Sequence, residues 1–169
     1  MSYWQSFNGN ARAFSLVAWV VAAIVALGAI TPTAWAENYD KQGLVDADFS
    51  AQELRDSSFV KANLRNSNFS DADLVGASFF GANLEGANLK GANLTTATLD
   101  SARFSYTNLT NAVLEGAFAY NAKFEGATVD GADFTDVLMR SDAQARLCEQ
   151  AKGTNPTTGR DTRQTLGCR

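Results

Sequence analysis

The sequence predicts a solenoid, a rod of short stacked coils, and three repeating positions carry that prediction. Every fifth residue from Leu44 to Met139 is apolar, without a break in register. Ala stands two residues before these centres in fourteen of twenty repeats, and Gly recurs two residues after them. A period of five is neither the 3.6 residues of a helix nor the two of a strand. Tandem repeats this short bury their apolar residues by stacking one coil on the next.

Each repeat position has a physical role in such a coil. The apolar centre fills the interior, and the Ala two residues earlier indicates that this interior is narrow. Asn, Asp, Ser or Thr precedes most centres, and these side chains bond back to the nearby backbone and favour turns. Gly after the centre tolerates the positive φ angles of tight corners. The rival interpretation is an amphipathic helical bundle, but the Gly, Asn, Asp and Thr content is poor for helices.

The sequence of the repeats resembles that of a known family. Two consecutive runs read Ala82-Asn83-Leu84-Glu85-Gly86 and Ala87-Asn88-Leu89-Lys90-Gly91. They resemble pentapeptide-repeat proteins, and the resemblance covers about 100 of the 169 residues. It implies an all-β fold, a right-handed quadrilateral β-helix with four pentapeptides per coil. Residues 44–140 then predict about five coils, a rod roughly 24 Å long at a strand spacing of roughly 4.8 Å.

Residues 1–36 do not share the repeat and have the layout of a secretory signal peptide. A long uncharged stretch follows Arg12, and the small residues Ala34 and Ala36 frame a cleavage site. We therefore expect cleavage between Ala36 and Glu37. The apolar stretch is long for a signal core, so an uncleaved membrane anchor is the alternative.

Composition limits the classes of function. The chain has 14 Lys and Arg, 18 Asp and Glu, no His and a net charge of −4. Removal of residues 1–36 would take away only Arg12, leaving about −5 (13 against 18). This mild acidity aids solubility and does not favour nucleic acid. Asp48, Asp73 and Asp133 lie several repeats apart, so we interpret them as turn residues and expect no metal or other cofactor. No placement of residues suggests a base–nucleophile pair, so we expect no enzyme.

Both ends of a solenoid need covers, because the terminal coils expose the core and an unpaired edge. At the N-terminal end, residues 37–43 are the predicted cap and lead-in. At the other end, residues 141–169 are the predicted C-terminal cap. There Ser141-Asp142 can cap a helix that runs to about Lys152 and ends at Gly153.

Cys148 and Cys168, the two cysteines of the chain, both lie in the predicted C-terminal cap. Two cysteines in an exported chain most often form one disulfide. Closing a loop of about 20 residues would stabilise the fold by on the order of 3 kcal/mol. The alternative is a redox-responsive pair.

The tail also resembles the C-terminal segment of the pentapeptide-repeat proteins of the thylakoid lumen in cyanobacteria and plastids. The residues that carry this resemblance are Leu147-Cys148, Gly153-Thr154-Asn155-Pro156, Thr158-Gly159, Thr162-Arg163 and Leu166-Gly167-Cys168. The resemblance implies a lumenal protein, whereas the signal peptide alone would allow the periplasm equally.

One side of the predicted rod gathers apolar residues. If four repeats make a coil, residues 20 apart stack on the same side. Ala119 is the one small residue at a centre, and its neighbours are expected to face outward. The candidate interaction patch on this side is Val60, Phe80, Phe118, Tyr120 and Leu138. Grouped exposed apolar residues usually mark an interaction site. Two alternatives stay open: Phe118 turns inward through a bulge and fills the space that Ala119 leaves, or the tail helix covers this side.

Three classes of function follow. The first is a non-catalytic scaffold or protein-interaction module in an exported compartment, with a role in the assembly or stability of a membrane complex. Its partner would be a protein, with membrane contact only through the signal or anchor segment. The second is a mimic of duplex DNA that occupies a topoisomerase, known for family members that confer quinolone resistance. Export argues against it, as do the basic residues that interrupt the acids: Lys61, Arg65, Lys90, Arg103 and Lys123. The third is a redox protein that uses the cysteine pair.

Overall fold

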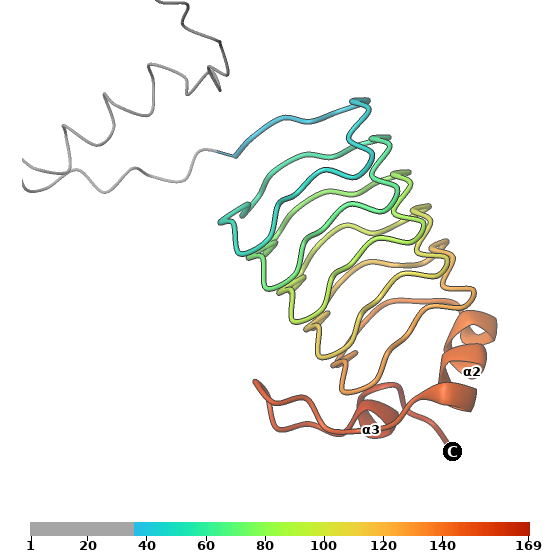
Figure 1. Cartoon of the computed structure of the whole chain (residues 1–169). Coiled ribbons are helices and arrows are strands. Elements are labelled where there is room, and N and C mark those ends of the chain that lie inside the picture. Colours follow the sequence, from blue (N-terminus) through green and yellow to red (C-terminus); the bar gives the residue numbers. More distant parts are fainter. Residues whose placement is uncertain (1–35) are drawn as a thin grey trace, which may run out of the picture. The chain divides into compact units, whose positions relative to one another are not determined.

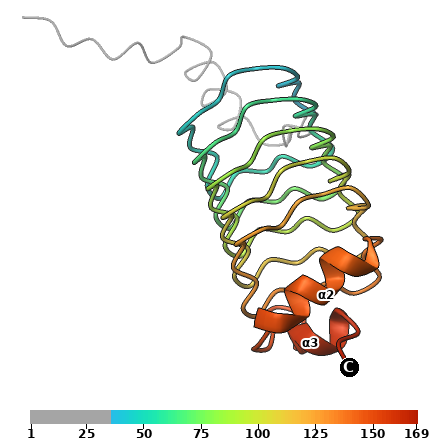
Figure 2. The same cartoon turned by 90° about the vertical axis from the view of Figure 1, so that its right-hand side faces the viewer.

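The repeats form a coil of 20 residues per turn. The computed structural model describes residues 36–169, in which successive coils stack to make a four-sided rod (Figures 1 and 2). Seventeen parallel bridges join the coils, from Asn38–Ser58 to Phe118–Leu138, and each links residues 20 apart. Four pentapeptides per coil is therefore confirmed, and about five coils lie between residues 37 and 140.

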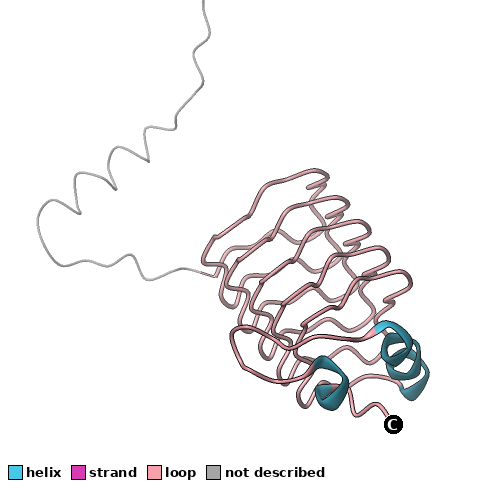
Figure 3. Ribbon diagram, turned by 60° about the horizontal axis from the view of Figure 1, so that its bottom comes forward, coloured by secondary structure: helices cyan, strands magenta, loops and turns pink. Residues whose placement is uncertain are grey.

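The coils pair through single residues and not through extended strands. Within the described part of the chain, every bridge is isolated, and Figure 3 accordingly draws the coils as loops. The expected all-β rod thus has the ladder of a β-helix without regular strands. The reason is geometric: a five-residue side has two residues in a turn, and only the middle one of the remaining three forms a bridge.

The apolar centres and the Ala positions make the core. The centres from Phe49 to Phe134 and nearly all the Ala positions are buried. In the first half of the rod, Phe rings stack in pairs 20 residues apart, with ring centroids 4.8 Å apart for Phe49–Phe69 and 4.9 Å for Phe59–Phe79. Offset stacking at this spacing adds to the energy of burial. The small Ala positions let the coils close tightly around these rings.

The corners behave as the sequence predicts. The Gly residues two after a centre have positive φ, for example +72° at Gly86. Non-Gly residues occupy the same position with the same conformation elsewhere, including Asn66 and Thr96 at +56°. Asn and Asp before a centre accept a hydrogen bond from the backbone N–H two residues on, as Asn88 Oδ1 does from Lys90 N. On one side the amides also form a ladder, in which Asn88 Nδ2 donates to Asn68 Oδ1 and Asn108 Nδ2 donates to Asn88 Oδ1.

Residues 37–43 differ from the predicted cap, because they already follow the coil. Tyr39 occupies a repeat centre, and its ring stacks on Phe59 with centroids 4.8 Å apart. Burial, together with a hydrogen bond to Glu37 and the charge of Glu37, raises the pKa of Tyr39 to about 12. In this first coil, Gln42 and Gln52 replace the usual Ala, and each side-chain amide donates to a backbone carbonyl of its own coil. Polar side chains therefore cover part of the N-terminal end. The predicted signal segment lies outside the described residues except for Ala36, which is exposed.

The tail forms two helices that lie across the C-terminal end of the rod (Figure 2). Helix α2 spans Ser141–Gln150, and α3 spans Thr162–Thr165. The predicted α2 is confirmed, but its cap is not: Arg140 is the N-cap, without a side-chain hydrogen bond, and Asp142 lies in the first turn and pairs with it. The carboxylate still favours the helix, because anions near a helix N-terminus complement its dipole. Helix α3 was not predicted, since four residues give no periodic signal.

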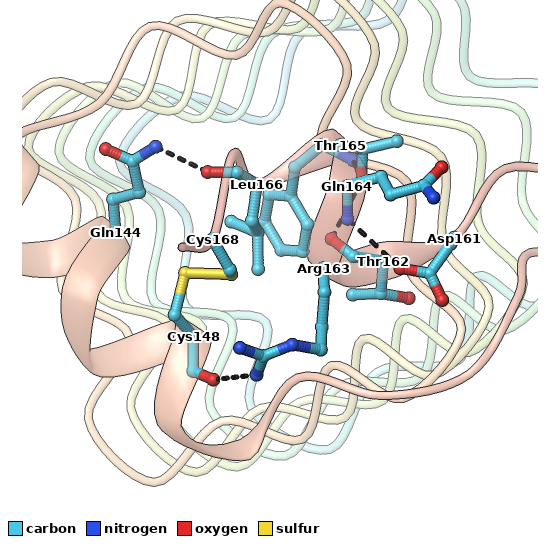
Figure 4. Close-up of a disulfide and its surroundings, with 10 residues drawn as sticks. Gln144, Cys148, Asp161, Thr162, Arg163, Gln164, Thr165, Leu166 and Cys168 are labelled. Carbon is cyan, nitrogen blue, oxygen red and sulfur yellow. Dashed lines mark hydrogen bonds between the residues drawn. A yellow bond between two sulfur atoms is a disulfide. The ribbon is translucent and has the colours of Figure 1, made fainter.

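A disulfide joins α2 to the end of the chain. The Sγ atoms of Cys148 and Cys168 are bonded, as Figure 4 shows. Around it, the Gln144 side chain donates to the Leu166 carbonyl, and Arg163 Nη1 donates to the Cys148 carbonyl at 2.6 Å. Leu147 and Leu166 are buried beneath this layer. The disulfide and these hydrogen bonds thus join α2 to the last residues of the tail, above the core.

Candidate interaction surface

The residues of the predicted patch share one side of the rod, which we call the aromatic side. It is formed by two outward columns: Ser58, Ser78, Thr98, Phe118 and Leu138, and Val60, Phe80, Asp100, Tyr120 and Arg140. Parallel bridges link Thr98 to Phe118 and Phe118 to Leu138, so these side chains are neighbours along the column. The 20-residue period therefore places residues far apart in sequence side by side.

The patch is exposed, with α2 in place. The exposed fractions are 41% for Phe80, 48% for Phe118, 61% for Tyr120 and 57% for Leu138. Among the described residues, six large hydrophobic side chains are exposed, and four of them lie on this side. Val60 is only partly exposed, so it adds less to the patch than its place in the column predicts.

The structure distinguishes between the alternatives for Phe118. Its ring does not turn inward, and Ala119 itself is fully buried at the centre. Met139, one coil further on, packs against the core in the same column of centres. The tail helix does not cover the aromatic side either, because the exposures hold in its presence.

A local change of the backbone accompanies the patch. At the corner between Tyr120 and Ala122, Asn121 departs from the positive φ that the matching corner residues adopt along the described coils. Its N–H donates to Asp100 Oδ1 at 2.9 Å, and its Nδ2 donates to the same oxygen at 3.2 Å. Asp100 lies between Phe80 and Tyr120 in the outward column. Its carboxylate is thus drawn to the corner by two hydrogen bonds.

Two exposed apolar residues lie away from this side and were missed. Tyr106 is 71% exposed at a corner, and its ring lies against Gly126 one coil later. Val45 is exposed near the N-terminal end. The sequence signal for Tyr106 is its place at a corner position that normally holds Gly, Asn or Asp.

The C-terminal cap is anchored by Asn155, which is fully buried. Its Nδ2 lies within hydrogen-bond distance of three carbonyls of the last coils, those of Asn111, Ala112 and Gly131, at 2.9–3.2 Å. Its Oδ1 accepts from Thr157 N and Thr158 N. The sequence does not predict these contacts with the coils, because they depend on how the tail folds back.

An ion network extends this anchor. Arg160 Nη2 donates to Glu115 Oε2 at 2.7 Å, and its Nη1 lies 3.3 Å from Oδ2 of the buried Asp133. Burial acts to raise the pKa of Asp133, but hydrogen bonds from Thr135 and Thr158 and the charge of Arg160 outweigh it. The pKa of this carboxyl is therefore below its usual value. The ionised carboxylate is part of the folded cap.

The acidic turn residues act structurally. Asp48 Oδ1 accepts from Ser50 N at 3.0 Å, and Asp73 Oδ1 accepts from Val75 N at 3.2 Å. The hydrogen bond from Ser50 holds the pKa of Asp48 below its usual value. Across residues 36–169, no cluster of three or more candidate metal ligands is present. Nor does any helix in this range combine the length and hydropathy needed to cross a membrane.

The charges of the rod are mixed. Basic side chains stand exposed among the acids at Lys61, Arg65, Lys90, Arg103 and Lys123. Some are paired, such as Arg103 with Glu85 at 3.9 Å. Acidic and basic side chains are therefore interspersed along the described surface.

Comparison with known proteins identifies relatives of this chain. A family model described as pentapeptide repeats matches residues 44–79, 77–116 and 102–140. The crystal structure of a pentapeptide repeat protein from the thylakoid lumen of Arabidopsis thaliana matches with a TM-score of 0.76 at 47% identity. This match covers 78% of the present chain and 91% of that one, so it extends beyond the repeats.

Two further relatives are more limited. The chloroplastic thylakoid lumenal 15 kDa protein 1 of Arabidopsis thaliana is 57% identical over 37 residues, which make up 22% of this chain and 16% of that protein. HetL, a pentapeptide repeat protein involved in heterocyst differentiation regulation in the cyanobacterium Nostoc, matches at 23% identity with a TM-score of 0.29. That match covers 68% of this chain and 52% of HetL, and at this similarity it carries no argument about function.

Proposed function

The chain belongs to the pentapeptide-repeat family, and we propose that it acts as a non-catalytic scaffold that binds a protein partner through its aromatic side. The observation that carries this proposal is the grouping of Phe80, Phe118, Tyr120 and Leu138 on one side of a rigid rod. Burial of such side chains against a partner contributes about 25 cal/mol for each Å² of apolar surface removed from water. A rod whose coils are fixed by backbone hydrogen bonds loses little entropy on binding, which favours such a contact.

The proposed compartment is the thylakoid lumen, with the periplasm as second choice. The lumenal relative at 47% identity supports this proposal, together with the signal-like layout of residues 1–36. Cleavage would leave Glu37 at the N-terminus of the exported protein. Sequencing of the mature N-terminus and fractionation of the source membranes test it: a lumenal protein that begins at Glu37 is expected, and an intact protein in the cytosol would contradict it.

Within that compartment we propose a role in the assembly or stability of a membrane complex. The aromatic side gives a partner-binding surface without a catalytic cleft. A Phe80→Ser/Tyr120→Ser double variant is expected to lose its cross-linked partner on affinity capture from the native compartment. Tyr106→Ser, which removes an exposed aromatic ring away from the aromatic side, is the matched control and should retain it. Unchanged recovery with the double variant would overturn the proposal.

A further inference from the structure

We propose that the protein has a second docking site, in which one extended segment of a partner polypeptide adds to the open edge of the last coil beneath α2. We call this edge, residues 121–126, the coil edge. It lies on a different side of the rod from the aromatic side, so this inference does not depend on the function proposed above.

The coil edge presents backbone groups whose equivalents in the preceding coils are hydrogen-bonded to the next coil. In the coil before, Phe104 N donates to Lys123 O at 2.7 Å, and Tyr106 N donates to Glu125 O at 2.8 Å. The equivalent groups one coil later are Phe124 N and Gly126 N, and within residues 36–169 neither has a hydrogen-bond partner. The carbonyl of Ala122, equivalent to the paired carbonyl of Ala102, likewise accepts none within that range. Unpaired edges of this kind are templates for strand addition.

Other parts of the last coil are already paired with the tail. Gly131 N donates to Lys152 O at 2.8 Å, Phe134 N donates to Thr165 Oγ1 at 3.1 Å, and Gln150 Nε2 donates to Ala127 O at 2.8 Å. The cap over these parts would block a second rod from stacking end to end. A single extended chain is therefore the occupant that the coil edge fits.

Hollows accompany the coil edge along its length. One, of about 340 Å³, lies between Phe124–Gly126 and the α2 residues Ala143, Leu147 and Gln150. Another, of about 330 Å³, lies between Asn121–Lys123 and Arg140–Ala143. Both are also lined by Glu125, Ala143 and Arg146, so they run on from one another beneath α2. A pentapeptide in extended conformation is roughly 17 Å long.

The register of the coils defines what the peptide must offer. Its residue opposite Lys123 would donate N–H to the Ala122 carbonyl and accept from Phe124 N through its own carbonyl. The residue opposite Glu125 would accept from Gly126 N. Between them, the residue opposite Phe124 would face inward, and its side chain must be small because Ala143 and Leu147 already pack there. These bonds repeat the pattern of the coil below, where Lys123 N donates to Ala102 O at 3.0 Å.

The charges around the hollows do not select for a charged peptide. Lys123 and Arg146 stand beside Glu125 and Glu149, so the rim is balanced. The site would therefore recognise the backbone groups of the peptide and the size of its inward side chain. We infer a neutral, extended segment with a small residue at the inward position.

A titration observed by amide NMR tests this inference. The probe is the acetylated and amidated pentapeptide Ser-Asn-Ala-Thr-Gly, with Asn set opposite Lys123 and Ala opposite Phe124. At about 1 mM peptide we expect the amide resonances of Phe124 and Gly126 to shift and their solvent exchange to slow, while the already bonded amides of Phe104 and Tyr106 stay unchanged. Absence of any change at Phe124 and Gly126 would overturn the inference.

Backbone-methylated peptides provide the matched control. Methylation of the backbone nitrogen of the peptide's Asn removes the donor to the Ala122 carbonyl and should weaken binding about tenfold. Methylation of the Thr nitrogen, which has no partner in this register, should leave affinity within about twofold. Equal binding of all three peptides would contradict strand addition, as would perturbations spread evenly over the rod. The Phe80→Ser/Tyr120→Ser variant should bind the peptide normally, so failure here is separable from failure of the aromatic-side proposal.

Discussion

Phe118 pairs with Leu138 in a parallel bridge, and both apolar side chains face solvent on the same side of the rod. Two outward positions one coil apart therefore hold apolar side chains, whose exposure to water is unfavourable. Since the column that holds Phe118 and Leu138 carries Ser58 and Ser78 in its earlier coils, the change to Phe and Leu in this column is local to its C-terminal end. This local change is why the aromatic side, and not the rod as a whole, is the proposed interaction surface.

The core makes the first prediction. Leu89 is fully buried at a repeat centre, so Leu89→Ala should lower the free energy of unfolding by about 2–5 kcal/mol. Its exposed neighbour gives the control, since Lys90→Ala should change that free energy by no more than about 0.5 kcal/mol. Denaturant unfolding followed by circular dichroism measures both. Similar losses for the two variants would contradict the assigned inward and outward positions.

The disulfide makes the second. Replacing Cys148 and Cys168 together by Ser should lower stability by on the order of 3 kcal/mol, because a loop of about 20 residues is no longer closed. The circular dichroism spectrum of the coils should be unchanged at temperatures below the lowered melting transition, and capture of the partner should be unaffected. A partner that is gained or lost with the redox state, without a change in stability, would instead favour a redox-responsive role.

Asn155 makes the third. Its amide is shared among three carbonyls of the last coils, and Asn155→Ala leaves them without this donor in a buried place. We expect a loss of about 1–3 kcal/mol, with faster hydrogen exchange in the tail than in the rod. Thr157→Ala, at an exposed position of the same turn, is the control. If both variants match the parent, the tail is held by other contacts.

Asp133 makes the fourth, on pH. Its pKa is lowered in the folded state, so the unfolded chain binds more protons in acid and stability falls as pH falls. The contribution is complete above the unfolded pKa of about 3.9 and is lost as pH drops through the lower folded value. Asp133→Asn should be less stable at pH 7 and should show a flatter decline in melting temperature towards pH 3. Parallel curves for parent and variant would show that this carboxyl does not contribute.

Much of the rod follows from the sequence because each repeat position has one physical task. A Leu or Phe every fifth residue requires a coil that returns to the same interior, and Gly86 or Gly91 marks a corner that has a positive φ. The patch followed from the same arithmetic, once residues 20 apart were placed on one side. What the repeat encodes locally is therefore predictable.

The remaining features depend on contacts between distant segments. Tyr39 falls within the predicted lead-in, and only the structure shows that its ring stacks on Phe59. Asn155 likewise acquires its role only because the folded tail brings it to the Gly131 carbonyl. Positive φ at Thr96 is imposed by the coil against the preference of a β-branched residue. The coil edge is unpaired because residues 141–150 form α2 and do not continue the rod as a further coil.

The central claim is tested most directly by site-specific photo-cross-linking in the native compartment. A photoreactive side chain at Tyr120, on the aromatic side, is compared with one at Lys90. Lys90 lies 30 residues earlier, which is one and a half coils of 20 residues, and is therefore on the opposite side of the rod. We predict that the Tyr120 position captures one discrete protein partner and that the Lys90 position captures none. Equal capture from both positions, or none from Tyr120, would contradict the account.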